Sequence, residues 1–333
     1  MNLDASLNAI NQRVSPEMNE SLTAEFKAEE VWRALKQMHP TKAPGPDGMS
    51  PIFFQHYWDI VGFKVINCVL NSLNSGVMPY GIIETYICLI LKVKSPQKIT
   101  KYRPISLFNV IYKIISKVLA NRLKRKLTEI IDESQSAFVL GRLISDNVLV
   151  AFETMHNIDQ RRKGKEALMA VKLDMSKAYD RVEWVYLEAM MRRMGFHERW
   201  ISLIMMCVTI VEYSVLINEE AKGKINTTRG LRQGDPISPY LFLLCTEGLS
   251  AMLKKEESDG QIKGVVVYKG ASHVSHLLFA NDSIVFCRAS VEECDRLIKV
   301  LKEYEGDSRQ KLNKEKTSLF FSKNTPRETQ EYV

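Results

Sequence analysis

The chain has 333 residues, of which 45% are apolar and 26% charged, and its formal net charge is +7. This length and composition suit one large or two ordinary globular domains and exclude an intrinsically disordered protein. The longest uncharged apolar runs, such as YICLIL, are far too short to cross a bilayer, and the first residues do not resemble a signal peptide. We expect a globular intracellular protein without membrane contact, with nucleus and cytoplasm equally open.

The N-terminal part of the chain predicts a helix followed by a rigid loop. The first forty residues are net acidic, and Thr23 and Glu29 precede apolar positions at helical spacing, namely Val31, Trp32, Leu35 and Met38. The stretch TKAPGPDGMSP, residues 41–51, then holds three prolines and two glycines. Such a density of proline and glycine is typical of a rigid loop.

A strongly basic segment follows. Eleven lysines and arginines and no acidic residue lie between Lys92 and Lys126. Within it, residues 109–131 predict a long amphipathic helix, with Ile111, Ile114, Ile115 and Val118 on one face and a basic opposite face formed by Lys113, Lys117 and Lys124. A solvated face usually alternates charge sign, so we expect this segment to contact a nucleic-acid backbone or a triphosphate.

The rest of the chain mixes strands and helices without strict alternation. The predicted elements are a strand at 167–175 (ALMAVKLDM), a helix from about Val182, strands at 211–217 and 223–230 joined by the turn NEEAKG, a helix from about 237 to 255 after RQGDPISP, a hairpin at 276–287 (HLLFANDSIVFC), and a helix from about 291 to 304. This order predicts an α+β fold.

Two aspartates stand at strand ends in this pattern. Asp174 closes the strand at 167–175, and Asp282 lies at the tip of the hairpin. If the two strands are neighbours, both carboxylates converge at one edge of a sheet. Mg²⁺ prefers such hard oxygen ligands and shares its coordination shell with substrate phosphates. Two ions about 3.5–4 Å apart would stabilise the attacking and leaving oxygens of a nucleotidyl transfer.

An ordered series of motifs supports a functional role for Asp174 and Asp282. In chain order they are KAPGPDGMSP, LILKVKSPQKITKYRPISLFNVIYKIISKVLANRL, QSAFVLGRLISDN, KLDMSKAYDRVEW, GLRQGDPISPYLF, HLLFANDSIVF and GDSRQKLNKEKT. With this series the chain resembles a reverse transcriptase of the LINE-type (non-LTR) retrotransposons, in the form common in plant genomes. The resemblance covers nearly everything from residue 41 to 322.

The resemblance implies a right-hand polymerase with fingers and palm and with the thumb absent or truncated. Residues 1–40 would form an N-terminal helical extension, 41–165 a fingers-type region, 166–323 the palm, and 324–333 a truncated tail. It also implies two Mg²⁺ or Mn²⁺ ions, an RNA template, a DNA primer, dNTP substrates, and a larger retrotransposon polyprotein as the parent of this chain.

The resemblance assigns catalytic roles in the palm. Asp174 would be the metal-binding aspartate of the first palm motif, and Asp282 the second member of the family's Asp-Asp pair. Tyr179 would be the aromatic platform under the incoming sugar, excluding a 2′-hydroxyl. Lys316 would protonate the leaving pyrophosphate. The alternatives are core packing for Tyr179 and a plain surface position for Lys316.

Other assignments concern the substrate. Gln233 and Gly234, with Arg232 beside them, would line the nucleotide pocket, where a glycine allows close backbone approach. Lys92 and Arg103 match the fingers residues that clamp the triphosphate, an arginine giving bidentate geometry and a lysine a point charge. The alternative for Arg232 and Gln233 is that they satisfy hydrogen bonds within a loop.

The sequence departs from the family at its hairpin tip, where Asn281 replaces the first aspartate. The change removes a full negative charge beside the expected cations, and a unit charge pair about 4 Å apart at an effective dielectric constant near 20 is worth roughly 4 kcal/mol. We therefore expect severe impairment or loss of activity. Leu91, Leu140 and Arg309 also depart from the family, which has proline, proline and glycine there.

Two other functions remain open. The first is a catalytically inactive, nucleic-acid-binding remnant of a retrotransposon polyprotein, which retains the basic segment but turns nothing over. The second is a palm-type enzyme of another family, such as an intron maturase or a nucleotide cyclase, which the strings RQGDPISP and KAPGPDG disfavour.

Overall fold

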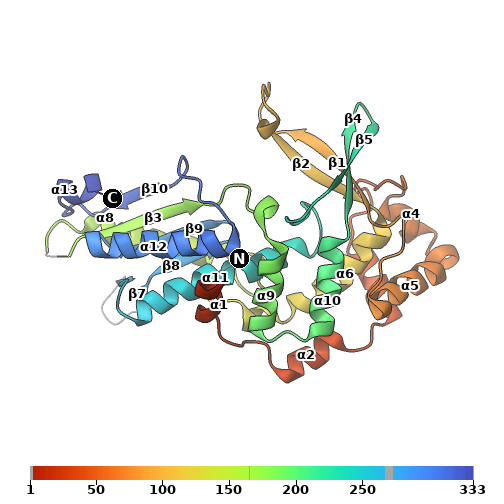
Figure 1. The fold of residues 1–333 in the computed structure, drawn as a ribbon, viewed down its shortest axis with the longest axis horizontal. Helices are drawn as coiled ribbons and strands as arrows, with labels where there is room; N and C mark the ends of the chain where they lie inside the picture. Colours follow the sequence, from red (N-terminus) through yellow and green to blue (C-terminus); the bar gives the residue numbers. More distant parts are fainter. Residues whose placement is uncertain (1–2, 165, 267–272, 333) are drawn as a thin grey trace. The chain divides into compact units, whose positions relative to one another are not determined.

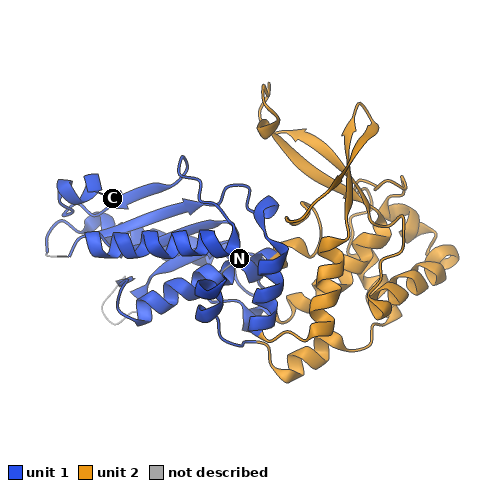
Figure 2. Cartoon of the chain, in the orientation of Figure 1, with its two compact units in different colours: residues 1–13, 127–194, 242–333 blue, residues 14–126, 195–241 orange. Residues whose placement is uncertain are grey.

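The computed structural model describes residues 3–164, 166–266 and 273–332. The chain forms two compact units, each discontinuous in sequence (Figure 2). Unit 1 comprises Met1–Arg13, Leu127–Met194 and Phe242–Val333, and unit 2 comprises Val14–Lys126 and Gly195–Leu241. Because the chain enters each unit more than once, consecutive segments such as 41–165 and 166–323 do not coincide with the units.

Unit 1 is built around an antiparallel four-stranded sheet (Figure 1). Its order is β10-β3-β9-β8, with β3 (Leu168–Asp174), β8 (His276–Phe279), β9 (Asp282–Arg288) and β10 (Ser318–Phe321). Helix α8 (Ile144–Gln160) packs on one face through Ile158. Helix α12 (Val291–Ser308) packs on the other face, where Cys294 contacts Met169. The near-continuous apolar sequence of β3 follows from its burial on both faces.

The remaining described elements of unit 1 surround this sheet. They are α1 (Asp4–Ala9), α7 (Leu127–Ile130), the 3-10 turn η2 (Tyr179–Arg181), α9 (Trp184–Met194), most of α11 (Ser238–Ser258), the short strands β6 (Val265–Val266) and β7 (His273–Val274), and α13 (Arg327–Tyr332). Helix α1 packs against α9 and α12. Within the ranges that the structure describes, every helix is too short or too polar to span a membrane.

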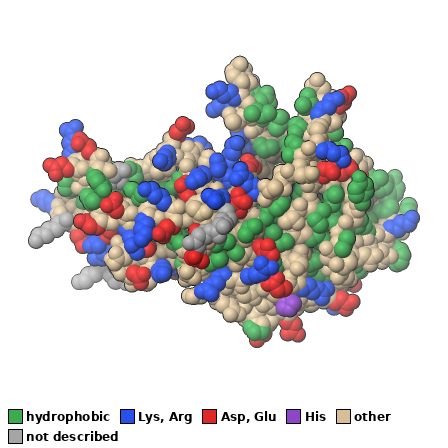
Figure 3. Space-filling model, in the orientation of Figure 1, with side chains coloured by type: hydrophobic (Ala, Val, Ile, Leu, Met, Phe, Trp, Pro, Cys, Tyr) green, Lys and Arg blue, Asp and Glu red, His purple; other side chains and the backbone are tan. Residues whose placement is uncertain are grey.

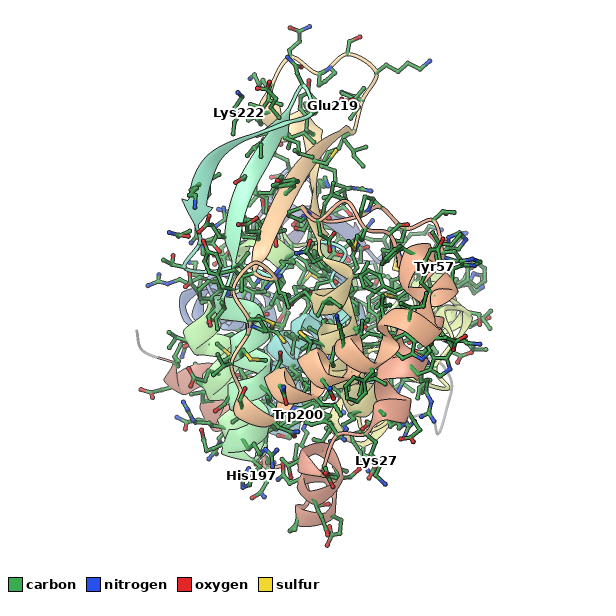
Figure 4. All side chains as sticks on the ribbon, turned by 90° about the vertical axis from the view of Figure 1, so that its right-hand side faces the viewer. Lys27, Tyr57, His197, Trp200, Glu219 and Lys222 are labelled. Carbon is green, nitrogen blue, oxygen red and sulfur yellow. The ribbon has the colours of Figure 1, made fainter. Side chains whose placement is uncertain are left out.

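Unit 2 combines helices with a second four-stranded sheet of order β2-β1-β4-β5. Its elements are α2 (Pro16–Thr23), α3 (Ala28–Lys36), α4 (Pro51–His56), α5 (Trp58–Ser75), β1 (Glu84–Leu91), η1 (Ile99–Lys101), β2 (Tyr102–Phe108), α6 (Val110–Lys124), α10 (Glu198–Thr209), β4 (Glu212–Ile217) and β5 (Glu220–Asn226). Figure 4 shows Glu219 and Lys222 at the outer end of the β4–β5 hairpin. Trp200 of α10 is fully buried.

The predicted amphipathic helix at 109–131 differs from the structure in two ways. It ends at Lys124, and a separate short helix, α7, follows. The expected exposed basic face is also wrong for Lys113, which is 4% exposed and donates a hydrogen bond from Nζ to the Ala43 carbonyl at 2.7 Å. Helix α6 packs against α2, α3 and α5, so most of its circumference is buried. Lys117 and Lys124 are half-buried.

Several other predicted elements are confirmed. The strand at 167–175, the hairpin at 276–287 and the helix from about 291 appear as β3, β8–β9 and α12. The turn predicted at 218–223 is shorter, because Asn218 and Glu219, with φ of +50° and +68°, form a two-residue turn and β5 begins at once. Positive φ at both central residues matches the twist of paired strands.

Candidate active site

The two aspartates singled out by the sequence lie directly opposite each other in unit 1. In the antiparallel pairing of β3 with β9, Asp174 is the partner of Asp282. Partners in such a ladder project from the same face of the sheet, with Cβ atoms about 4.5–5.5 Å apart. The apolar sequence of the two strands sets this register, because a slip by one residue would turn Val285 and its neighbours out of the core.

The hairpin tip beside them is a strained two-residue turn. Phe279 pairs with Asp282 across it, and Ala280 has φ of +53° while Asn281 does not, the pattern of a type II′ turn. The fully buried Gln135 supports the tip, since its Oε1 accepts a hydrogen bond from the Ala280 amide at 3.0 Å. Asn281 and Asp282 form no side-chain hydrogen bond with any other residue described here. The tip is therefore held by strand pairing and by Gln135, without help from the side chains of Asn281 and Asp282.

The Asp174 carboxylate has two neighbours from the segment after α12. Asn313 donates from Nδ2 to Asp174 Oδ2 at 3.2 Å, and its backbone amide donates to the Asp174 carbonyl at 2.8 Å. Lys316 places Nζ 3.5 Å from the same carboxylate oxygen. A backbone bridge between Met175 and Leu312 aligns the two segments. Lys316, a surface lysine in sequence terms, thus lies beside the aspartate pair.

Tyr179 lies in the turn η2, a short distance along the chain from Asp174. Its ring stacks on that of Phe242 in α11, with centroids 5.2 Å apart and planes 10° from parallel. Burial raises the pKa of the Tyr179 hydroxyl to about 12, so the phenol stays neutral at physiological pH. The side chain is half-buried. The stacked Phe242 ring restrains the orientation of the Tyr179 ring.

The basic residues expected to hold a triphosphate lie on the β1–β2 hairpin of unit 2. Ile90 pairs with Arg103, and the Lys92 amide donates to the Lys101 carbonyl at 2.9 Å. Alternation along the strands places the Lys92 and Arg103 side chains on the same face of the hairpin. Both are exposed. The structure thus brings these two predicted residues together, within unit 2.

The loop 232–235, from RQGDP, is held by a buried network in unit 2. Asp235 accepts hydrogen bonds from the Tyr112 hydroxyl at 2.5 Å, from the Ser116 hydroxyl, and from the Ile237 amide at 3.2 Å. Arg232 donates from its guanidinium to the Cys207 carbonyl at 2.5 Å and stacks over Tyr112. Both charged side chains are almost completely buried.

Between them, Gln233 and Gly234 remain accessible. Gly234 has φ of +98°, a conformation that favours glycine, and the Gln233 carbonyl accepts a hydrogen bond from the Ser106 amide at 3.3 Å. The predicted direct substrate contact of Arg232 does not fit this geometry, since its side chain is 3% exposed. The geometry gives Arg232 the alternative role, that of satisfying the loop.

Several residues that shape these sites were not predicted from the sequence. Asn313 and Gln135 lie inside the quoted motifs KLNKEKT and QSAFVLGR, so their position was a usable signal. Phe242 and Tyr112 also lie inside quoted motifs, GLRQGDPISPYLF and the long basic one, but an aromatic residue in an apolar run is most simply read as core.

Comparison with known proteins identifies the chain. The family model for reverse transcriptase (RNA-dependent DNA polymerase) matches residues 91–331. The chain belongs to the reverse transcriptase family. Members of this family copy nucleic-acid templates and generally use divalent metal ions. Among the residues that the structure describes, no cluster of three or more His, Cys, Asp and Glu side chains could hold a metal.

Two relatives of the chain are proteins of transposable elements. An uncharacterized 149 kDa protein of transposon TX1 from Xenopus laevis is 30% identical over 305 residues, which are 92% of this chain and 23% of that protein. A retrovirus-related Pol polyprotein from the R2 element of Nasonia vitripennis is 24% identical over 262 residues, 77% of this chain and 24% of the polyprotein. The chain thus spans about a quarter of the length of these relatives.

A plant relative matches a shorter part of the chain with higher sequence identity. An uncharacterized mitochondrial protein of Arabidopsis thaliana is 46% identical over 68 residues, 20% of this chain and 56% of that protein.

Proposed function

We propose that the chain is the polymerase module of a plant-type non-LTR retrotransposon, with a palm in unit 1 and fingers in unit 2. It extends a DNA primer with dNTPs on an RNA template, at a rate greatly reduced by Asn281. The observation that carries the proposal is the register of β3 and β9, which sets Asp174 and Asp282 side by side with Lys316 at the same edge.

The residues of unit 1 take these roles in the proposed reaction. The primer 3′-hydroxyl loses its proton to solvent and its oxygen attacks the α-phosphorus of the dNTP, while the bond to the β-phosphate oxygen breaks and pyrophosphate leaves. Lys316 donates a proton to that leaving group. Tyr179 supports the sugar from below, with Phe242 fixing its ring. Lewis-acid stabilisation of the oxygen charges is the chemistry supplied by bound divalent cations.

The donor set fits a divalent cation, because Asp174 and Asp282 offer two hard carboxylates on adjacent strands and the Asn281 amide oxygen can add a neutral ligand. A third carboxylate, at residue 281, would increase the affinity of the site for two divalent ions. We therefore expect Mg²⁺ or Mn²⁺ with substrate oxygens completing the shell, and weaker metal binding than with an aspartate at that position.

In unit 2, Lys92 and Arg103 are proposed to contact the triphosphate, and Gln233 with Gly234 the nucleotide. The parent protein would be a larger retrotransposon polyprotein. Whether further parts, such as a thumb, contribute to primer grip is tested by comparing the chain with longer versions of it.

Primer extension with an RNA template tests the catalytic part of the proposal. The Asn281→Asp variant should raise the extension rate by roughly 100-fold or more, since the restored charge is worth up to about 4 kcal/mol before solvent screening. Adding Asp174→Asn to it should abolish that gain. A matched control, Asp259→Asn in the same background, changes an exposed aspartate that follows α11 and is not at a strand end, and it should alter the rate less than about three-fold. No gain in a well-folded Asn281→Asp protein would refute the metal role of this corner.

A second function, nucleic-acid binding without turnover, is favoured by Asn281 together with the basic β1–β2 hairpin. Lys94, Lys98 and Lys101 are exposed and form no ion pair with another residue that the structure describes. Neutralising Lys98 and Lys101 to Gln should lower the slope of log affinity against log salt by roughly 1.4–1.8 for single-stranded or duplex ligands. The buried Lys113→Gln is the control and should leave the slope unchanged. Binding that does not depend on salt would refute this function.

A further inference from the structure

Helix α8 is the least covered long helix of unit 1. Of its seventeen residues, only Thr154 and Ile158 are buried. Its outer side carries a run of large apolar side chains, which we call the α8 stripe: Ile144, Val148, Leu149 and Phe152, exposed by 54%, 57%, 61% and 64%. Leu140 and Leu143, in the loop before the helix, extend it. The spacing of Ile144, Val148 and Phe152 places them one above the other on the same helix face.

The α8 stripe is larger than the single exposed apolar side chains that are common on protein surfaces. These six side chains together present on the order of 500 Å² of apolar area, the size at which patches on monomeric proteins are often functional. Helix α8 contacts the sheet of unit 1 through its inner side, at β3 and β8, so its outer side is not needed for that packing.

The charges on α8 restrict what can cover the stripe. Between Ile144 and Gln160 the helix carries Asp146, Glu153 and Asp159 and no lysine or arginine. Asp159 is already paired with Lys323, with Oδ2 and Nζ 2.9 Å apart, so Asp146 and Glu153 are the carboxylates that a partner would meet. The His156 ring stacks on Phe152 at the C-terminal end of the stripe. A nucleic-acid backbone would be repelled by these carboxylates and would gain nothing from the apolar stripe. A second copy of the chain would bring two sets of carboxylates to one interface without a cation from either helix, and like charges across an interface are unfavourable.

We propose that the α8 stripe is the docking surface for an amphipathic helix of another protein segment, whose apolar face is bordered by lysine or arginine. The apolar face of that helix would pack on Val148 and Phe152 in the helix-in-groove manner, and its basic border would meet Asp146 and Glu153. This inference is independent of the polymerase activity. Helix α8 is also tied to the β8–β9 hairpin, since Asn147 donates from Nδ2 to the Leu278 carbonyl at 2.9 Å.

A second apolar surface provides a matched control. On α5 of unit 2, Ile60 and Phe63 are exposed by 76% and 77%. Figure 3 shows hydrophobic side chains gathered at its right, where α4 and α5 lie. Asp59 and Lys64 lie beside them, so this surface carries both signs of charge and selects no partner by charge.

The test uses two designed peptides of about 18 residues, long enough to follow the roughly 25 Å of α8 as helices. One has leucine on one face and lysine at its border, and the other has glutamate in place of lysine. We expect the full chain to bind the Leu/Lys peptide at least about ten-fold more tightly than the Leu/Glu peptide, measured by fluorescence anisotropy. The double variant Val148→Ser, Phe152→Ser should lose this binding by about ten-fold, and Ile60→Ser, Phe63→Ser should retain it within about two-fold.

A charge variant keeps the proposal testable if the stripe variant folds poorly. Glu153→Lys leaves the apolar residues in place and should move the preference toward the Leu/Glu peptide. Equal binding of both peptides, no detectable binding of the Leu/Lys peptide, or an unchanged preference in Glu153→Lys would overturn the proposal. Self-association in sedimentation that the stripe variant abolishes would point to a second copy instead. Weakened binding of an RNA–DNA duplex by that variant would point to nucleic acid. Either result would also overturn the proposal.

Discussion

The hairpin tip of unit 1 and the loop 232–235 of unit 2 both carry family motifs, yet they use their polar residues in opposite ways. At the tip, Asp282 is exposed and makes no side-chain hydrogen bond to the residues that the structure describes. In the loop, Asp235 is 5% exposed and accepts three hydrogen bonds. One aspartate is open to solvent, and the other holds the fold.

This difference explains how the change at residue 281 is compatible with an intact fold. The tip is held by strand pairing and by Gln135, so replacing a carboxylate with an amide there removes no packing and leaves no buried group unpaired. The same replacement in the buried loop would leave the Arg232 guanidinium without its charge partner. Chemistry can therefore be lost at the tip at little cost in folding free energy.

The largest effect is expected from breaking the buried loop. Asp235→Ala should lower the free energy of unfolding by about 3–5 kcal/mol, because Arg232 would keep a buried, uncompensated charge. Asp282→Asn should change it by less than about 0.5 kcal/mol. Urea unfolding of both variants measures the contrast, and similar losses in the two proteins would show that the comparison between tip and loop is mistaken.

A buried charge in unit 1 extends the comparison to pH. Burial raises the pKa of Glu247 to about 7, although the Arg13 guanidinium pairs with it. A carboxyl that binds its proton more tightly in the folded state contributes stability below its ordinary pKa of 4.5, and this contribution is lost as the pH rises through 7.

Glu247→Gln should therefore flatten the pH dependence of unfolding between about pH 4.5 and 7.5 by roughly 2–3 kcal/mol. Denaturant unfolding at a series of pH values checks this. An unaltered profile in Glu247→Gln would mean that the buried carboxyl is ionised throughout.

A smaller effect is expected at the support of the tip. Gln135→Leu removes the acceptor of the Ala280 and Ala137 amides and should cost about 1–2 kcal/mol. Hydrogen exchange at the Ala280 amide should quicken by about ten-fold or more, whereas Asn281→Ala should leave it near its original rate. Unchanged protection of Ala280 in Gln135→Leu would show that strand pairing alone holds the tip.

The smallest effect concerns a departure from the family at the end of α12. Arg309 has φ of +58°, the left-handed conformation that a helix C-terminus commonly gives to glycine, which the family has there. Arg309→Gly should raise the melting temperature, with a gain of about 0.5–1 kcal/mol. Arg309→Ala retains the backbone strain and should give no such gain. Equal stability of Arg309→Gly and Arg309→Ala would show that the left-handed backbone at residue 309 does not lower the stability.

Much of unit 1 could be predicted from the sequence because its signals are local. The apolar run ending in Asp174 and the paired runs around Asn281 define strands by their own patterns, and the ordered motifs identify the family. The strands β1 and β2 and the helices α8 and α10 were not foreseen. Their apolar residues lack clean alternation or clear caps, and their environment is set by distant parts of the chain.

The sequence by itself determined the family and the order of its motifs, and it predicted which residues would carry the family's chemistry, with Asn281 in place of the first aspartate of the expected pair. Residue type and order are sufficient for such a prediction. Only the tertiary structure decided that Asp174 faces Asp282, that Lys113 and Arg232 lie inside the protein, and that the α8 stripe lies outside. Burial and register depend on long-range packing, and identical residues can be placed in the core or at the surface by elements far away in the chain.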